Sequence, residues 1–197
     1  MLARILIFAV LLGGVCWGAE GASDSSLLNQ LNAGRKDEDR LTPESVAFQR
    51  PAEFPNLVLV GYRQGTSNFL LGTIFVDGKP MSPREASAEV MPRAGWGKDE
   101  ATRLELAKLW VEKVMLAFGD LLVNEDPGGQ FGKRGNPEYS PPHLRATPDG
   151  GVRFSAWIEE PQGAQVGQTY RRSLYLFSPD GEMTRVKMLE RFYQMEE

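Results

Sequence analysis

Residues able to do acid–base or nucleophilic chemistry are few and scattered in this chain. The single histidine, His143, follows two prolines in the run 140–144. A catalytic histidine needs an oriented carboxylate and a nucleophile beside it, and the sequence indicates neither. The adjacent acids Glu159 and Glu160 lie in a predicted strand, where neighbouring side chains point to opposite faces, so they cannot flank one bond. We predict no catalytic residue and favour a non-enzymatic protein.

Phosphate and metal motifs do not match either. The run 128–134 looks like a phosphate loop, but it has Pro127 where the motif needs glycine and Arg134 where it needs Ser or Thr. It also follows a predicted helix, so no helix N-terminus would face a phosphate. Three acids near it lack the spacing of a calcium loop: Asp120, Glu125 and Asp126. We predict no metal site and no cofactor.

Composition limits the classes of protein that remain. Cys16 is the only cysteine and lies in the N-terminal apolar segment, so disulfides and thiolate chemistry are not expected in the mature chain. The formal net charge of −4 gives no global attraction to nucleic acid. A length of 197 residues with 42% hydrophobic content is enough to bury one core.

The N-terminus has the pattern of an export signal. Arg4 precedes an apolar run over residues 5–15, and small residues follow it: Gly18, Ala19 and Ala22. The run falls short of the roughly 20 apolar residues of a membrane-spanning helix. We therefore predict a signal peptide over residues 1–19, cleaved between Gly18 and Ser23, and a periplasmic or secreted protein without a transmembrane helix in the mature chain.

A lipid anchor is the alternative at this end. Residues 13–16 resemble the lipobox of bacterial lipoproteins, which would place lipid on Cys16. Val15 stands where that motif has a small residue, so we favour cleavage without lipid.

The rest of the chain divides into a polar segment and one domain. Residues 20–55 carry few apolar side chains and are expected to be partly mobile or laid over the domain. Residues 56–197 are predicted to fold as a single α+β domain. Its expected elements are a hairpin of strands 57–62 and 69–76, a short helix from Ser82 to Pro92, a helix over 99–123 and three strands at 152–160, 170–177 and 184–194.

The long helix sets the expected architecture. Its apolar residues recur at intervals of three and four: Leu104, Ala107, Val111, Val114, Phe118 and Leu121. So wide an apolar stripe predicts one long helix packed against a curved antiparallel sheet of about five strands. This outline is similar to cystatin-like and NTF2-like folds, and the similarity implies no function.

The connection over residues 124–151 is too long for an ordinary loop of a compact domain. It contains three side chains suited to binding: Phe131, Tyr139 and His143. A binding loop and a disordered loop both fit, and its Gly and Pro content favours disorder slightly.

Alternation along the last three strands predicts a basic, aromatic face. Val152, Phe154, Ala156, Ile158, Leu174, Leu176, Val186, Met188 and Phe192 are expected to face the helix. The opposite face would collect Arg153, Trp157, Glu159, Arg171, Tyr175, Phe177, Arg185, Lys187, Arg191 and Tyr193. Among these we name the candidate ligand-binding residues: Trp157, Arg171, Tyr175, Lys187, Arg191 and Tyr193. The alternative is an ordinary solvated sheet face.

These features favour an exported, non-enzymatic binding or accessory domain that uses this face or the 124–151 loop. Arginine pairs with carboxylate or phosphate, so the expected partner is an anionic polymer or an acidic protein. Two alternatives stay open: a small enzyme with a pocket between helix and sheet, and a structural subunit that associates through its sheet, which allows a homo-oligomer.

Overall fold

The computed structural model describes residues 22–63, 70–126, 131–133, 135–160 and 168–194. The predicted signal peptide and Cys16 lie outside these residues. The helices are α1 (Asp24–Asn32), α2 (Pro83–Ala94), α3 (Glu100–Trp110), the short 3₁₀ turns η1 (Asp37–Asp39) and η2 (Pro43–Ser45), and the π-helix η3 (Val111–Met115).

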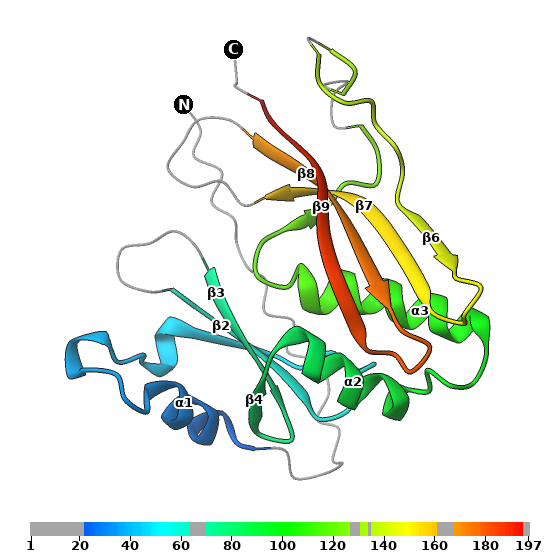
Figure 1. Cartoon of the computed structure of the whole chain (residues 1–197). Coiled ribbons are helices and arrows are strands. Elements are labelled where there is room, and N and C mark those ends of the chain that lie inside the picture. The colour runs from blue at the N-terminus through cyan, green and yellow to red at the C-terminus, as the bar shows by residue number, and fades with distance from the viewer. Residues whose placement is uncertain (1–21, 64–69, 127–130, 134, 161–167, 195–197) are drawn as a thin grey trace.

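The strands form two antiparallel sheets (Figure 1). Sheet A has the order β1 (Val46–Gln49), β2 (Leu57–Arg63), β3 (Leu70–Val76) and β4 (Lys79–Met81). Sheet B has the order β5 (Leu121–Leu122), β7 (Val152–Glu160), β8 (Gln168–Phe177) and β9 (Met183–Gln194), with β6 (His143–Ala146) also paired to β7. The α+β class is confirmed. The expected single long helix on one sheet is wrong, because the described residues form three α-helices and two sheets.

The described part of the polar segment before residue 56 packs on sheet A through α1 and joins the sheet through β1. Ser23 caps α1 by accepting a hydrogen bond from the Ser26 N–H at 3.3 Å. Leu27 of α1 is fully buried and packs against Val58, Val60 and Phe75 of the sheet. Strand β1 extends the sheet by pairing with β2, so sheet A begins before the expected start of the domain. The partial mobility of this segment stays a prediction.

Helix α2 begins as its sequence indicates. The Ser82 hydroxyl accepts from the Glu85 N–H at 3.3 Å, and the Glu85 carboxylate accepts from the Ser82 N–H at 2.9 Å. This reciprocal pair satisfies two backbone donors at the helix start. The helix continues past Pro92, the expected end, and stops at Gly95, whose φ of 101° favours glycine.

The predicted helix over 99–123 is too long. Asp99 caps α3, the regular helix ends at Trp110, and the π-helix η3 carries the chain to Met115. Val114 remains buried, so the apolar spacing continues although the hydrogen bonding has changed. Leu121 starts β5 and is 60% exposed. Spacing alone does not distinguish a π-turn followed by a short strand from more α-helix.

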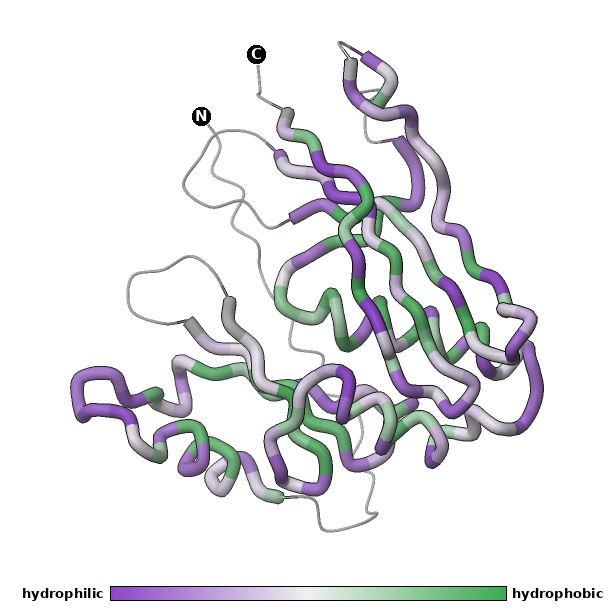
Figure 2. The backbone as a smooth tube through the Cα atoms, in the orientation of Figure 1, coloured by the Kyte–Doolittle hydropathy of each residue, from purple (hydrophilic) through white to green (hydrophobic). Residues whose placement is uncertain are grey.

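One hydrophobic core joins the two sheets and the helices between them. Its buried members come from every layer: Leu59 and Ile74 of sheet A, Val90 of α2, Trp110 of α3, and Phe154 and Tyr175 of sheet B. Figure 2 shows hydrophobic stretches along β2, β3, α3 and β7, and these elements contribute buried residues to the core. The second face of sheet A, under α1, forms a separate cluster.

The turn between β8 and β9 is fastened to the helical layer. The Trp96 indole N–H donates to the Pro179 carbonyl at 2.8 Å, and the Met183 N–H donates to the Ser87 hydroxyl at 2.7 Å. Gly181 lies so close that an added Cβ would stand 2.6 Å from the Met91 Cβ. The start of β9 is therefore held against α2.

A pair of glycines admits an aromatic ring at the centre of sheet A. Gly61 and Gly72 are directly opposite each other in β2 and β3. A Cβ on Gly72 would lie 2.0 Å from the Phe118 ring, and one on Gly61 would lie 3.0 Å from it. The ring thus occupies the space of two absent side chains and ties the end of the helical segment to sheet A.

Candidate binding face

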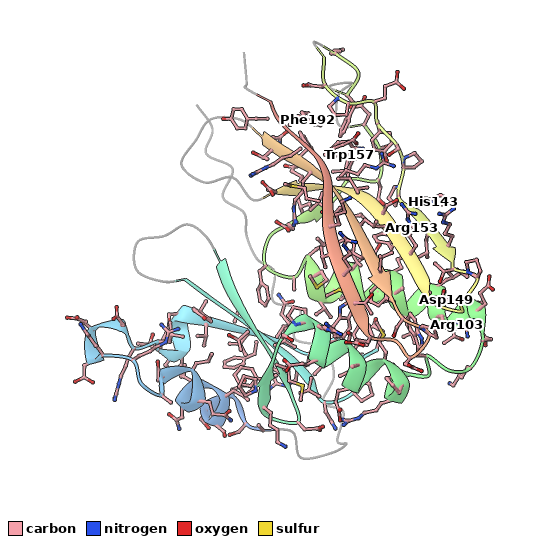
Figure 3. The ribbon with its side chains drawn as sticks, in the orientation of Figure 1. Arg103, His143, Asp149, Arg153, Trp157 and Phe192 are labelled. Atoms are coloured by element: carbon pink, nitrogen blue, oxygen red, sulfur yellow. The ribbon has the colours of Figure 1, made fainter. Side chains whose placement is uncertain are left out.

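The outer face of sheet B carries two rows of side chains across four strands. In the first row Arg145 of β6 lies opposite Arg153 of β7, followed by Leu176 of β8 and Arg185 of β9. In the second row His143 lies opposite Ser155, followed by Leu174 and Lys187. We call the four cations of these rows the basic face: Arg145, Arg153, Arg185 and Lys187. Figure 3 shows His143 and Arg153 on neighbouring strands of this sheet.

The basic face is accessible and its rows hold no acid. Arg145, Arg185 and Lys187 are exposed, and Arg153 is partly exposed. None of the four forms an ion pair within the part of the chain that the structure describes. Two leucines lie between the cations in the rows, and arginine stems can cover such apolar surface while their charged ends stay in water.

Arg145 and Arg153 are direct cross-strand neighbours. Side chains in such positions have Cβ atoms about 4.5–5.5 Å apart, and like charges there destabilise a sheet. The next cross-strand row on this face holds the first acid, Glu190, which already pairs with Arg172 at 3.4 Å. The electrostatic repulsion between the two arginines is thus not relieved within their own rows.

Two predicted ligand-binding aromatics are buried instead of exposed. Tyr175 faces the main core and is 1% exposed. Trp157 does lie on the outer face, but it is fully buried in an aromatic cluster. The cluster consists of Val123, Phe131, Tyr139, Trp157, Tyr170 and Phe192. Figure 3 shows Trp157 and Phe192 close together, beyond the basic face.

The predicted loop residues Phe131 and Tyr139 belong to this aromatic cluster. The Phe131 ring lies 4.9 Å from the Trp157 ring and 5.0 Å from the Phe192 ring, both edge to face. Burial, with the carboxylates of Glu159 and Asp126 nearby, raises the pKa of Tyr170 to about 12. The described parts of the 124–151 connection therefore pack on sheet B and include β6, contrary to the expected structureless loop.

Arg171 and Arg191 lie on the inner face, paired with acids. Arg171 forms ion pairs with Asp120 and, at 3.2 Å, with Glu160, and Arg191 reaches Glu160 at 2.6 Å. Burial raises the pKa of Asp120, and the Arg171 guanidinium opposes that shift. Two cations thus face two carboxylates, which leaves no excess positive charge for a ligand. Tyr193 shares this face and is 44% exposed.

The predicted single face was therefore half right. Arg153, Trp157, Arg185 and Lys187 share the outer face as expected.

Strand β8 has the opposite phase: Tyr175 pairs with Phe154 on the inner face, and Leu174 points outward. Both alternating sets of β8 end in two apolar residues, Tyr175 and Phe177 in one set and Leu174 and Leu176 in the other, so alternation could not choose between them. In β9, a bulge at Leu189 reverses the phase, which moves Arg191 and Tyr193 inward and Phe192 outward. Arg145 was missed because it lay in a segment assigned to a loop.

A groove of about 380 Å³ lies between sheet A and the π-helix. Its lining is Gly72, Thr73, Ile74, Met81, Ser82, Pro83, Val114, Met115 and Phe118. None of these side chains is an acid or a base, and the Ser82 hydroxyl already bonds within the α2 cap. The groove lies between helix and sheet, where the enzyme alternative expects a pocket. Its lining provides no group for acid–base catalysis.

His143 is exposed at the start of β6 and faces Ser155 across the strands. No carboxylate stands in their row to orient the imidazole, so the pair does not form a catalytic triad. Among the described residues, no three His, Cys, Asp or Glu side chains gather as a metal site would require. No helix in the described ranges is both long and apolar enough to cross a membrane.

Comparison with known proteins found no matching family model, no matching curated protein and no matching solved structure.

Proposed function

We propose that this chain is an exported, non-enzymatic binding domain that holds an anionic partner on the basic face. One observation carries the proposal: four accessible cations occupy two neighbouring rows without an acid among them. They do so on a protein whose formal net charge is −4. A local positive field on an acidic protein attracts anions to one surface while the rest of the molecule repels them.

The chemistry of the face favours carboxylate, sulfate or phosphate groups over bases. Arginine offers planar, paired donors that match such anions. Stacking on nucleic-acid bases needs exposed rings, and Trp157 on this face is covered by Phe131. An anion seated between Arg145 and Arg153 would also offset the repulsion between them. These features support a polyanion or an acidic protein as the partner.

Export remains a prediction from the N-terminal sequence. It would place the basic face outside the cytoplasm, where it would meet anionic polymers or acidic proteins of the cell envelope or the medium.

A defined polyanion tests this proposal. Fluorescein-labelled poly-L-glutamate should bind the parent protein in fluorescence anisotropy titrations. The affinity should fall steeply as NaCl rises from about 0.05 to about 0.5 M, since exposed charges are screened within about 8 Å already at physiological ionic strength. The double variant Arg145→Glu with Arg153→Glu should lose this binding. His143→Ala should keep it, because the imidazole is not one of the four cations.

A matched control separates the face from the net charge. Lys79→Glu with Lys98→Glu alters the total charge by the same amount at exposed positions outside the basic face. This control should bind nearly as well as the parent. Equal binding by the face variant and the parent, or no salt-sensitive binding at all, would reject the proposal. Loss of an enzymatic activity on His143→Ala would instead favour the enzyme alternative.

A further inference from the structure

Strand β9 forms one edge of sheet B. It pairs with β8 along its length, and no other described strand pairs with it. Every residue from Thr184 to Arg191 is exposed. The free backbone donors and acceptors of such an edge can accept another strand.

The edge contains one regular stretch between two irregularities. The pairing with β8 skips Thr184 and Leu189, so both are bulges. Between them, Arg185 to Met188 pair regularly with residues 173–176 of β8. A bulge re-aims the strand and interrupts pairing, so an added strand would find its best register over these four residues.

The side chains of this stretch differ sharply between its two faces. Arg185 and Lys187 point to the outer face and belong to the basic face. Val186 and Met188 point to the inner face, where they remain 43% and 55% exposed. Figure 2 shows hydrophilic and hydrophobic residues alternating along β9. The edge thus presents cations on one side and uncovered apolar side chains on the other.

We propose that β9 accepts an extended peptide segment of a protein partner in which acidic and apolar residues alternate. The segment adds as a further strand, with its acids beside Arg185 and Lys187 and its apolar residues beside Val186 and Met188. Neighbouring strands lie about 4.8 Å apart, which brings cross-strand side chains into contact. Main-chain hydrogen bonds supply affinity in this mode, and the alternating side chains supply specificity. This inference rests on the proposed function and names its partner.

Charge complementarity selects this occupant over a second copy of β9. A second basic strand would bring arginine and lysine against arginine and lysine, and like charges opposite each other destabilise a sheet. The same cations attract an acidic strand. Specificity of this kind needs a repulsive element against the wrong partner as well as an attraction to the right one.

The probe is a synthetic capped peptide in which Glu and Val alternate. It should bind on the order of tenfold more tightly than an isomer with the repeat Glu-Glu-Val-Val, which has the same composition and charge but mixes acids on both faces. Methylation of alternate backbone nitrogens in the alternating peptide should remove most of the binding, because the methyl groups replace the donors that pair with β9.

A variant of the protein gives the second readout. The double variant Val186→Ser with Met188→Ser should bind the alternating peptide more weakly than the parent protein does. It should bind poly-L-glutamate as the parent does, since the basic face is intact. The inference is overturned if the methylated peptide or the mixed isomer binds as well as the alternating one. It is also overturned if β9 pairs two copies of the chain into a dimer that the serine variant dissolves. Failure of poly-L-glutamate to bind would reject the proposed function itself, so the two failures are distinguishable.

Discussion

Gly61 and Gly72 show how single residues decide the packing of this protein. Their missing side chains leave room for the Phe118 ring, which follows the π-helix and seats the helical layer on sheet A. Glycine is ordinarily a poor strand residue, because it costs backbone entropy and packs nothing. Here the ring does the packing, so the usual preference for a larger residue is reversed.

Gly72→Ala should lower the free energy of unfolding by about 1–3 kcal/mol, because the new methyl group would overlap the Phe118 ring. In a Phe118→Ala background the same change should alter the free energy of unfolding little, since the ring that clashes with the new methyl group is absent. Urea denaturation of the four proteins of this cycle measures both values. Gly97→Ala is the control, with no atom within 4 Å of its added Cβ. An equal cost in both backgrounds would contradict the assigned contact.

At the scale of elements, the segment around Phe131 covers the outer end of sheet B. Phe131 is 7% exposed and contacts the rings of Tyr139, Trp157, Tyr170 and Phe192. Edge-to-face aromatic pairs contribute about 0.5–1.5 kcal/mol beyond the area that they bury. Phe131 and Tyr139 thus both hold this segment on the sheet, and the Tyr139 hydroxyl donates to the Val123 carbonyl at 3.3 Å. The segment divides the outer face into a buried aromatic part and an open basic part.

Phe131→Ala should lower the free energy of unfolding by about 3 kcal/mol, through lost burial and the cavity that remains. It should also shift tryptophan emission to longer wavelength, because water gains access to Trp157. Lys133→Ala, at an exposed position of the same segment, should stay within about 0.5 kcal/mol of the parent. Unchanged emission in the Phe131 variant would show that this ring does not cover Trp157.

The sequence predicted the elements better than it predicted their faces. The hairpin of β2 and β3, the capping box of α2 and the meander of β7 to β9 follow from turn chemistry and alternation, which are local signals. The phase of β8 does not, because both of its faces are buried in part: Tyr175 in the main core and Tyr170 under Phe131. A strand covered on both sides loses its alternation, and a bulge such as Leu189 has no sequence signature here.

The candidate site was predicted in part for the same reason. Arg153, Arg185 and Lys187 were placed together correctly, since β7 and the first half of β9 alternate clearly. Arg145 was not placed on this face from the sequence, because β6 is a strand of only four residues. Its alternation is too short to be recognised in a segment rich in Gly and Pro.

At the scale of the molecule, the two sheets share one core. Leu59 of sheet A and Phe154 of sheet B belong to the same buried cluster as the helices between them. A shared core couples the stability of both halves, as in other small domains that unfold in one cooperative step.

Leu59→Ala and Phe154→Ala should therefore each lower the midpoint of a single thermal transition. Both side chains are essentially buried, so each change should cost about 2–5 kcal/mol. Differential scanning calorimetry, with the calorimetric enthalpy compared to the van't Hoff enthalpy, measures the cooperativity. Two separate transitions, each sensitive to one variant only, would mean that the sheets unfold independently.

The bond from the Met183 N–H to the Ser87 hydroxyl spans 96 residues of chain. It belongs to the contacts that set the start of the last strand against α2, so the native arrangement is completed only when the C-terminal strands arrive. Contacts this distant along the chain make folding slow, because loop closure must precede any gain from pairing. Until β8 and β9 are in place, sheet A and the helices would keep their shared apolar side uncovered. A chain that still lacks these two strands is therefore exposed to aggregation, and its native state forms late.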